Sequence, residues 1–521
     1  MLLETSTIPA MMSHSAAVYR DRPAVEDGDV KLTYGELDEL RLEVARALIA
    51  MGVQPGDTVG ILAPNCFEWV AAALGIQTVG AVLLPLNTRM KGSELGDILQ
   101  RGGVRFLFSI GDFLGIYYPD LLDGGRPEQL EQVVVLRSAR PGDLSWESFL
   151  AHAAEVPRET AEEHGARVSA EHTADLMFTS GTTGRPKGVM TGHGQNLKVF
   201  HYYSGVLGLQ PGDRYLIVSP FFHSFGYKAG MLSALIRGAT ILPHQVFDAE
   251  AVLERVHRDR IHILPGPPTL YMSMLAHPRL AEYDCSSLRV AITGAAAIAP
   301  SLIQRMWSEL GFKVVLTAYG LTEACGCSTI CRPEDDAETI ANTSGRALPG
   351  LEVRVVDSQG KPLPPGEAGE IVIRGYGVMQ GYLNDPQATR EAIDTDGWLH
   401  TGDIGTLDER GYLRITDRLK DMFIVGGFNC YPAEIERLLV AHPAIAQVAV
   451  IGVPDERMGE VGKAFVVLRE DSSAEPEELQ RWAREHMANY KVPRYFEIVS
   501  SLPTSAAGKV VRYQLRESQS A

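Results

Sequence analysis

The chain has 521 residues, of which 45% are hydrophobic and 22% are charged, and its formal net charge is −17. This composition is typical of a globular protein with more than one domain, and the acidic balance argues against a nucleic-acid-binding protein, which usually carries a basic face. The apolar stretch 70–86 is interrupted by Gln77, Thr78 and Pro85, so we expect a buried helix and strand there and no membrane span. Because the N-terminus also lacks the basic and apolar regions of a signal peptide, we expect a cytoplasmic protein.

Short apolar runs alternate with amphipathic segments in the larger, N-terminal part of the chain. Thr33 and Glu36 form a capping box that opens a predicted helix, which ends at Gly52. A strand is predicted at 59–62, and Asn65 is the predicted N-cap of the next helix. Further strands are predicted at 81–86, 174–178, 215–218, 240–242, 261–264, 289–293 and 313–316. This alternation across short connections indicates an α/β domain with a largely parallel sheet.

The pattern changes towards the C-terminus. Segments 351–356 and 369–374 alternate apolar and polar residues around turns, which predicts a small antiparallel β unit. A break at 417–421 divides the chain into an N-terminal domain, residues 1–419, and a C-terminal domain, residues 420–521. In the C-terminal domain, helices are predicted at 432–440 and 475–487 and strands at 446–453 and 464–469. This mixture indicates a separate α+β domain of about one hundred residues.

The segment 178–189, Phe-Thr-Ser-Gly-Thr-Thr-Gly-Arg-Pro-Lys-Gly-Val, carries the clearest functional signal. Its glycines let backbone N–H groups approach an anion closely, while its hydroxyls and Lys187 add donors and positive charge. A Walker A loop opens a helix, whereas here Lys187 precedes Gly188 and an extended run, so we predict a hairpin between two strands. An ordinary surface turn is the alternative reading. The predicted polyphosphate ligands are Thr179, Ser180, Gly181, Thr182, Thr183, Gly184 and Lys187.

Four further segments carry residues that suit nucleotide chemistry. Tyr319 and Glu323 follow a predicted strand, and ligands bind at the carboxyl ends of strands in open α/β sheets; Tyr319 could stack on a base, and Glu323 could hold Mg²⁺. Asp403 could grip the two hydroxyls of a ribose, and Arg418 could reach a ribose or phosphate. Lys509 lies on a predicted C-terminal loop. Taken singly, these residues could equally be a core tyrosine, an Asx turn and solvated charges.

Together, these motifs resemble those of the adenylate-forming superfamily, which includes acyl-CoA synthetases, peptide-synthetase adenylation domains and beetle luciferase. The motifs follow the family's order along essentially the whole chain, at 178–189, 220–224, 294–296, 319–323, 401–403, 417–420, 426–429 and 508–509. The resemblance implies a large adenylate-forming domain followed by a small mobile domain. It also implies that a carboxylate and MgATP give an acyl-adenylate and pyrophosphate, after which a thiol takes the acyl group and AMP is released.

The resemblance implies a role for each motif residue of the larger domain. The phosphate loop, with Thr182 and Lys187 contributing to catalysis, would hold the β and γ phosphates, and Glu323 would bind Mg²⁺. Asp403 and Arg418 would hold the ribose. The adenine would lie between Tyr319 and the segment Gly294, Ala295 and Ala296, and Gly320 and Thr322 would also bind ATP.

The smaller domain is implied to contribute a catalytic lysine and a hinge. Lys509 would reach the substrate carboxylate and the α-phosphate, and the domain would rotate about Lys420. That rotation would bring Gly426, Gly427 and Phe428 towards the CoA channel. The sequence before Lys509 also resembles that around acetylated lysines of such enzymes, so a protein lysine acetyltransferase is an expected partner whose action removes the charge. A homodimer is a further expectation.

CoA is the expected thiol, because no carrier-protein domain accompanies the adenylating unit in this sequence. By family position, His223 would lie near the acyl carbon and the thiol's entrance. The other residues expected at the acyl and CoA pocket are Phe222, Phe225, Gly226, Tyr227, Lys228 and Pro267. Most of them are apolar or aromatic, which favours a bulky hydrophobic acid.

Three segments, 220–230, 264–271 and 316–324, resemble steroid-catabolic CoA ligases that act on an indanedione propanoate. Medium- or long-chain fatty acids and aryl acids are the alternative substrates. An adenylation module that serves a protein partner and a non-catalytic nucleotide-binding relative are the alternative classes. The non-catalytic nucleotide-binding relative is disfavoured because Lys509, Glu323 and the loop hydroxyls are all present.

Overall fold

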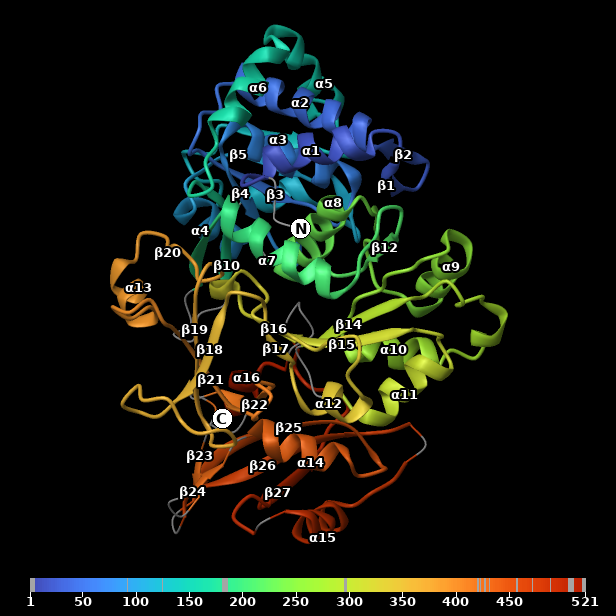
Figure 1. Ribbon diagram of the computed structural model, residues 1–521, viewed down its shortest axis with the longest axis vertical. Helices are drawn as coiled ribbons and strands as arrows, with labels where there is room; N and C mark the ends of the chain where they lie inside the picture. The colour runs from blue at the N-terminus through green and yellow to red at the C-terminus, as the bar shows by residue number, and fades with distance from the viewer. Residues whose placement is uncertain are drawn as a thin grey trace.

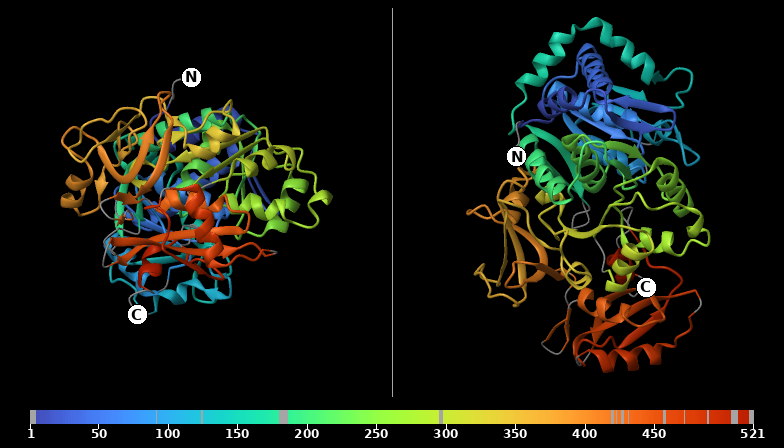
Figure 2. Two further views of the ribbon diagram at one scale, coloured as in Figure 1. Left: turned by 90° about the horizontal axis from the view of Figure 1, so that it is seen from below. Right: turned by 45° about the vertical axis from the view of Figure 1, so that its right-hand side comes forward.

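The fold is taken from a computed structural model, whose described residues form one eight-stranded sheet, three four-stranded sheets, a two-stranded sheet and the five-stranded sheet of a C-terminal unit (Figure 1). The structure describes residues 5–90, 92–123, 125–179, 186–294, 298–418, 421, 423–425, 428–430, 432–455, 458–470, 472–487, 489–504 and 510–517. Helices α2 (Tyr34–Ala50), α5 (Trp146–Ala151) and α6 (Arg158–Arg167) lie at the opposite end of the molecule from the C-terminal unit, as both figures show (Figures 1 and 2). Within the described residues, no helix combines the length and apolar character needed to cross a membrane.

The largest sheet has eight strands in the order β20-β11-β10-β4-β3-β5-β8-β9. Their bounds are β3 Thr58–Leu62, β4 Val82–Pro85, β5 Val104–Ser109, β8 Gln132–Val135, β9 Leu144–Ser145, β10 Thr173–Thr179, β11 Lys187–Gly192 and β20 Gly381–Tyr382. All pairs from β10 to β9 are parallel, which confirms the predicted parallel sheet. The apolar stretch 70–86 forms the buried helix α3 (Phe67–Val79) and strand β4, also as predicted.

Two four-stranded sheets lie beside this one, in the orders β12-β13-β1-β2 and β14-β15-β16-β17. Their bounds are β1 Pro23–Asp27, β2 Val30–Thr33, β12 Arg214–Ile217, β13 Thr240–Pro243, β14 Val290–Gly294, β15 Val314–Tyr319, β16 Thr329–Ile330 and β17 Arg346–Ala347. The strand predicted at 261–264 is reduced to a bridge, in which Ile263 pairs with both Tyr215 and Val290. Pro265 follows at once and has no N–H to extend a ladder.

The β unit and the C-terminal unit match their predicted classes. Strands β18 (Glu352–Val356), β19 (Gly369–Arg374), β21 (Leu399–Leu407) and β22 (Leu413–Arg418) form an antiparallel sheet. The C-terminal sheet runs β24-β23-β26-β25, with β27 beside β26. Its elements are β23 Phe423–Val425, β24 Phe428–Cys430, α14 Pro432–Val440, β25 Ile445–Asp455, β26 Gly459–Leu468, α15 Pro476–His486, β27 Tyr495–Ile498 and α16 Arg512–Glu517. The predicted boundary between residues 419 and 420 lies outside the described residues and stays a prediction.

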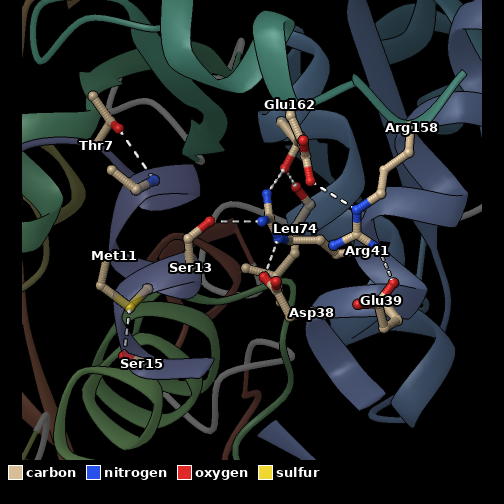
Figure 3. Close-up of polar contacts among 12 residues, drawn as sticks. Thr7, Met11, Ser13, Ser15, Asp38, Glu39, Arg41, Leu74, Arg158 and Glu162 are labelled. Atoms are coloured by element: carbon tan, nitrogen blue, oxygen red, sulfur yellow. Dashed lines mark hydrogen bonds and ion pairs between the residues drawn. The ribbon is translucent and has the colours of Figure 1, made fainter. Parts of the chain in front are cut away.

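Helix α2 begins with the predicted capping box. Thr33 Oγ1 accepts a bond from the Glu36 N–H at 3.2 Å, and Glu36 Oε2 accepts one from the Thr33 N–H at 2.8 Å. Further along α2, the buried Arg41 donates to Asp38 at 2.7 Å, to Thr78 of α3 at 3.0 Å and to Ser13 of α1 (Ile8–Tyr19) at 2.8 Å, as Figure 3 shows for Asp38 and Ser13. One guanidinium therefore holds three helices together.

The prediction that Asn65 caps α3 is wrong. The N-cap is Cys66, whose side chain makes no capping bond. The Asn65 side chain is buried and faces a segment more than 150 positions away: its amide donates to the carbonyls of Ile217 and Ser219, each at 2.9 Å, and its oxygen accepts from the Phe221 N–H at 2.7 Å. A polar side chain with three backbone partners is fully satisfied in the core. Asn65 thus fixes the chain that leads into the predicted acyl-pocket motif.

His193 begins helix α7 (His193–Val206) and links it to the N-terminal helix. Its ring is buried, and its Nδ1 atom accepts a bond from the Ile8 N–H at 3.3 Å. Burial, with a smaller effect from His172, lowers the pKa of His193 to about 3. The folded protein therefore holds this imidazole neutral at pH values where an unfolded chain would bind a proton.

We expect His193 to make the folded protein less stable as the pH falls. An unfolded histidine binds its proton below about pH 6.5, so the stabilisation present above that pH is lost as the pH falls towards the folded value. Between pH 7 and pH 5 the free energy of unfolding should decrease by about 2 kcal/mol more in the wild type than in His193→Gln. Urea unfolding at both pH values measures the difference, and an equal decrease in both proteins would contradict the assignment.

Candidate functional site

The strands on the two sides of the predicted phosphate loop pair with each other, as the sequence indicated. Strands β10 and β11 are antiparallel, and their last register pair joins Thr179 to Lys187. The Thr179 hydroxyl donates to the Lys187 carbonyl at 3.5 Å. The predicted ligands Ser180, Gly181, Thr182, Thr183 and Gly184 lie outside the described residues. The two described ligands therefore mark the points where the loop leaves and re-enters the sheet.

The outer side of this hairpin is held by Arg101, the last residue of α4 (Gly92–Arg101). Its guanidinium donates to the Pro186 carbonyl at 2.6 Å and lies 5.2 Å from the centre of the Phe178 ring. A cavity of about 610 Å³ opens here, beside Lys187. Another cavity of about 620 Å³ is lined by residues between 277 and 311 and contains none of the predicted ligands. Arg101 is thus a support for the loop that the sequence did not reveal.

The predicted adenine and ribose residues come together at one place. The Tyr319 hydroxyl, at the end of β15, donates to Asp403 Oδ2 of β21 at 2.6 Å, although the residues are 84 positions apart. Both are buried. Asp403 is in register with Arg418 on β22, and Gly294 ends β14 beside Ala318. Ala295 and Ala296 lie outside the described residues.

Gly320 allows the chain to turn sharply after β15. A Cβ atom at this position would lie 2.3 Å from the Gly326 carbonyl oxygen, so no other residue fits without a shift of backbone. The short helix η5 (Thr322–Ala324) follows and presents Glu323, whose side chain is partly exposed. Glu323 Oε1 accepts a bond from the Tyr382 hydroxyl at 3.0 Å. The predicted ATP-binding residue Thr322 and the predicted metal ligand Glu323 therefore both lie on η5.

A buried ion pair joins strand β10, which leads into the phosphate loop, to the predicted acyl-pocket motif. Lys228 Nζ lies 2.9 Å from Asp175 Oδ1, and neither side chain is exposed to solvent. Lys228 also donates to the Thr191 hydroxyl at 2.8 Å, and Asp175 accepts bonds from Thr191 at 2.8 Å and Asn196 at 2.6 Å. Lys228 was predicted at the acyl pocket, and its ammonium points into this cluster. Asp175 is a missed residue whose signal is a carboxylate within the apolar run 174–178.

The other residues predicted at the acyl pocket differ in how far they are exposed to solvent. Phe222, His223 and Phe225 are partly exposed, and the Phe225 N–H donates to His223 Nδ1 at 3.2 Å. Tyr227 is buried in the π-helix η3 (Phe225–Leu232), where its hydroxyl accepts a bond from Gln77 at 2.6 Å. Gly226 is enclosed by backbone, with a Cβ position 2.2 Å from the Pro220 carbonyl, and Pro267 is exposed at the start of α10 (Pro268–Leu275). The first three side chains are therefore the accessible part of this motif.

The mobile-domain predictions fall mostly outside the described residues. These are Lys420, Gly426, Gly427 and Lys509. Phe428 begins strand β24 and is in register with Val425 of β23. Their roles stay predictions.

All six cysteines of the chain are buried, and none of them forms a disulfide bond. Cys325 and Cys327 follow Glu323 within four residues. Burial raises the pKa of each of these two thiols to about 12. Within the described residues, no cluster of three His, Cys, Asp or Glu side chains could hold a metal ion.

Comparison with known proteins covers almost the whole chain. Residues 12–383 match the family model described as AMP-binding enzyme, and residues 434–509 match the AMP-binding enzyme C-terminal domain. The 7a-methyl-1,5-dioxo-octahydro-1H-inden-4-yl propanoyl:CoA ligase of Rhodococcus jostii is 47% identical over 523 residues, covering 99% of both chains. The ligase of the same name from Mycobacterium tuberculosis is 47% identical over 517 residues, covering 99% of this chain and all of that one. The crystal structure of the anthranilate CoA ligase AuaEII in complex with anthranoyl-AMP gives a TM-score of 0.87 at 28% identity, covering 99% of this chain and 98% of that one.

We expect the ion pair between Lys228 and Asp175 to be essential for stability. Lys228→Met leaves a buried carboxylate without its cation, which should lower the free energy of unfolding by about 3–5 kcal/mol. Urea unfolding of the two proteins measures this loss. The control is Arg167→Met, which removes a mostly exposed ion pair with Glu163 and should cost at most about 1 kcal/mol. Equal losses in the two variants would contradict the role of the buried pair.

Proposed function

Because the chain belongs to the family of AMP-binding enzymes, we propose that it is an acyl-CoA synthetase that uses ATP, Mg²⁺ and CoA to activate a steroid-derived indanedione propanoate. The observation that carries the choice of acid is the 47% identity, over 99% of the chain, to two ligases named for that acid. The half-exposed aromatic residues Phe222 and Phe225 suit a bulky, largely apolar ring system. Residence in the cytoplasm and a homodimeric state are part of the proposal.

In the first half-reaction, a carboxylate oxygen of the acid attacks the α-phosphate of ATP, and the bond to pyrophosphate breaks. Reactions of this kind are catalysed mainly by positioning and by neutralising charge. We assign the β and γ phosphates to the loop from Thr179 to Lys187, whose ends are fixed by the β10–β11 register. Asp403 and Arg418 are register partners and are assigned to the ribose. Tyr319, hydrogen-bonded to Asp403, is assigned to the adenine.

Glu323 fits a ligand of Mg²⁺, because this ion is usually anchored by one or two carboxylates together with waters and substrate phosphates. Its side chain is partly exposed, and the turn that carries it, η5, contacts the strand β11 that leaves the phosphate loop. When bound, Mg²⁺ would neutralise negative charge on the phosphate oxygens. We assign Glu323 to the metal ion and the Lys187 ammonium to direct neutralisation of phosphate charge.

In the second half-reaction, the CoA sulfur attacks the acyl carbon and AMP leaves. We assign Lys509 to the first half-reaction and His223 to the neighbourhood of the acyl carbon in the second. The proposed exchange between the two steps is a rotation of residues 420–521 about Lys420, which is domain closure of the hinge type. Acetylation of Lys509 by a protein lysine acetyltransferase would remove its charge and stop adenylation.

We expect the acid to be identified by pyrophosphate release. The indanedione propanoate should give the highest kcat/KM in a panel that also contains medium-chain, long-chain and aryl acids. A bulky ring that fills an apolar pocket gains about 1–3 kcal/mol for each well-placed group, which corresponds to about 5–150-fold discrimination. A fatty or aryl acid at the top of the panel would overturn the choice of acid, and release that never leads to an acyl-CoA would overturn the choice of thiol.

We expect Lys509→Ala to separate the two half-reactions. Removing a cation that stabilises the transferring phosphoryl group should slow adenylation by about 100-fold or more. Thioester formation from synthetic acyl-adenylate and CoA should stay within about threefold of the wild type. Pyrophosphate release and acyl-CoA formation measure the two steps, with Lys491→Ala, which removes another lysine of the C-terminal unit, as a matched control. Equal losses in both steps would rule out the assigned role.

A further inference from the structure

A short segment, residues 379–383, joins the turn that carries Glu323 to the strand that leaves the phosphate loop. We call this segment the 379–383 strap. Three of its backbone N–H groups donate to carbonyl groups on the two sides. These bonds are Met379 N to Glu323 O at 2.8 Å, Gln380 N to Met190 O at 2.9 Å and Leu383 N to Gly188 O at 2.7 Å. The strap therefore sets the distance between two parts of the site that are far apart in sequence.

One side chain of the strap contacts both parts. The Tyr382 hydroxyl donates to Glu323 Oε1 at 3.0 Å, and Lys187 Nζ lies 4.9 Å from the centre of the Tyr382 ring. A cation at this distance is attracted by the aromatic face. Tyr382 is itself fixed: its Cα is in register with Val189 across β11 and β20, and its N–H donates to the Thr389 hydroxyl of α13 (Pro386–Ala392) at 2.9 Å.

The contact with Glu323 joins a phenol hydroxyl to one oxygen of a carboxylate. The Tyr382 hydroxyl is the donor and Glu323 Oε1 is the acceptor. A hydrogen bond to one carboxylate oxygen restricts the rotation of the group and directs its other oxygen. The metal ligand is in this way oriented before any cation binds.

We propose that Tyr382 is a positioning residue for adenylation, which orients the Glu323 carboxylate through its hydroxyl and holds the Lys187 ammonium over its ring. The inference rests on the proposed function, because it takes Glu323 as the Mg²⁺ ligand. Tyr382 acts through these two residues and touches neither the acid nor CoA in this role. Its effect is therefore confined to the first half-reaction and to the requirement for Mg²⁺ and ATP.

Two variants distinguish the contribution of the Tyr382 hydroxyl from that of its ring. Tyr382→Phe keeps the ring over Lys187 and removes the bond to Glu323, so the Mg²⁺ concentration at half-maximal pyrophosphate release should rise about tenfold, as expected for the loss of a hydrogen bond to a charged group. Tyr382→Leu removes both contacts, so the KM for ATP should rise about fivefold further through the loss of the cation–π contact. Thioester formation from synthetic acyl-adenylate should match the wild type in both variants.

Tyr376→Phe is the matched control. Tyr376 also donates a hydroxyl bond, to the Pro349 carbonyl at 2.9 Å, and its ring also lies under a lysine, with Lys198 Nζ 4.5 Å from the ring centre. It contacts none of the residues assigned to ATP or Mg²⁺ in the described structure. If Tyr376→Phe shifted the Mg²⁺ requirement as much as Tyr382→Phe, the effect would be a general loss of packing and the inference would be overturned.

Glu323→Gln distinguishes this inference from the proposed function. If Glu323→Gln shifts the Mg²⁺ requirement and Tyr382→Phe does not, the positioning role of Tyr382 is wrong while the role of Glu323 stands. If neither variant shifts it, the assignment of Glu323 as metal ligand is wrong and the inference fails with it. A loss of thioester formation from synthetic acyl-adenylate in Tyr382→Phe would also overturn the inference, because the second half-reaction needs neither ATP nor its cation.

Discussion

The ammonium of Lys228 and the carboxylate of Asp175 meet in a region from which water is excluded. Removing two charges from water is costly unless each finds partners for its remaining hydrogen-bonding capacity. Here Thr191 bridges the pair and Asn196 completes the carboxylate. The cluster joins strands β10 and β11, helix α7 and the π-helix η3. The strands that carry the phosphate loop therefore cannot shift relative to the segment that follows His223 without exposing a buried charge.

Other contacts extend this constraint towards the nucleotide. Asn65 fixes the chain from Ile217 to Phe221, which enters the same segment from the other side. The bond between Tyr319 and Asp403 then ties the end of β15 to the antiparallel β unit. In each case a buried polar side chain joins elements that are far apart in sequence. These contacts hold parts of the site in place before any substrate binds, and preorganised charge is what transfer at phosphorus requires.

Local sequence patterns predicted most helices and strands, whereas they could not predict contacts between residues far apart in the sequence. The capping box of Thr33 and Glu36 and the hairpin around the phosphate loop depend on neighbouring residues, and both are present. Asn65 has the residue type of an N-cap, but its partners lie more than 150 positions away, so it was misassigned. Lys228 was placed by family position, and nothing near it in sequence announces Asp175 opposite. The predicted residues at 180–184, 295–296, 420, 426–427 and 509 lie outside the described residues, so their roles stay predictions.

The burial of Cys325 and Cys327 has a consequence for an enzyme that makes acyl-adenylates. Such mixed anhydrides react with thiolates, and a thiol becomes a good nucleophile only when it loses its proton. With pKa values of about 12, both thiols stay protonated near neutral pH, although they follow the Glu323 turn directly. The reactive acyl group therefore meets no internal thiolate from these two residues. Burial in this way protects the ligase from acylating itself and leaves the acyl group for an external thiol.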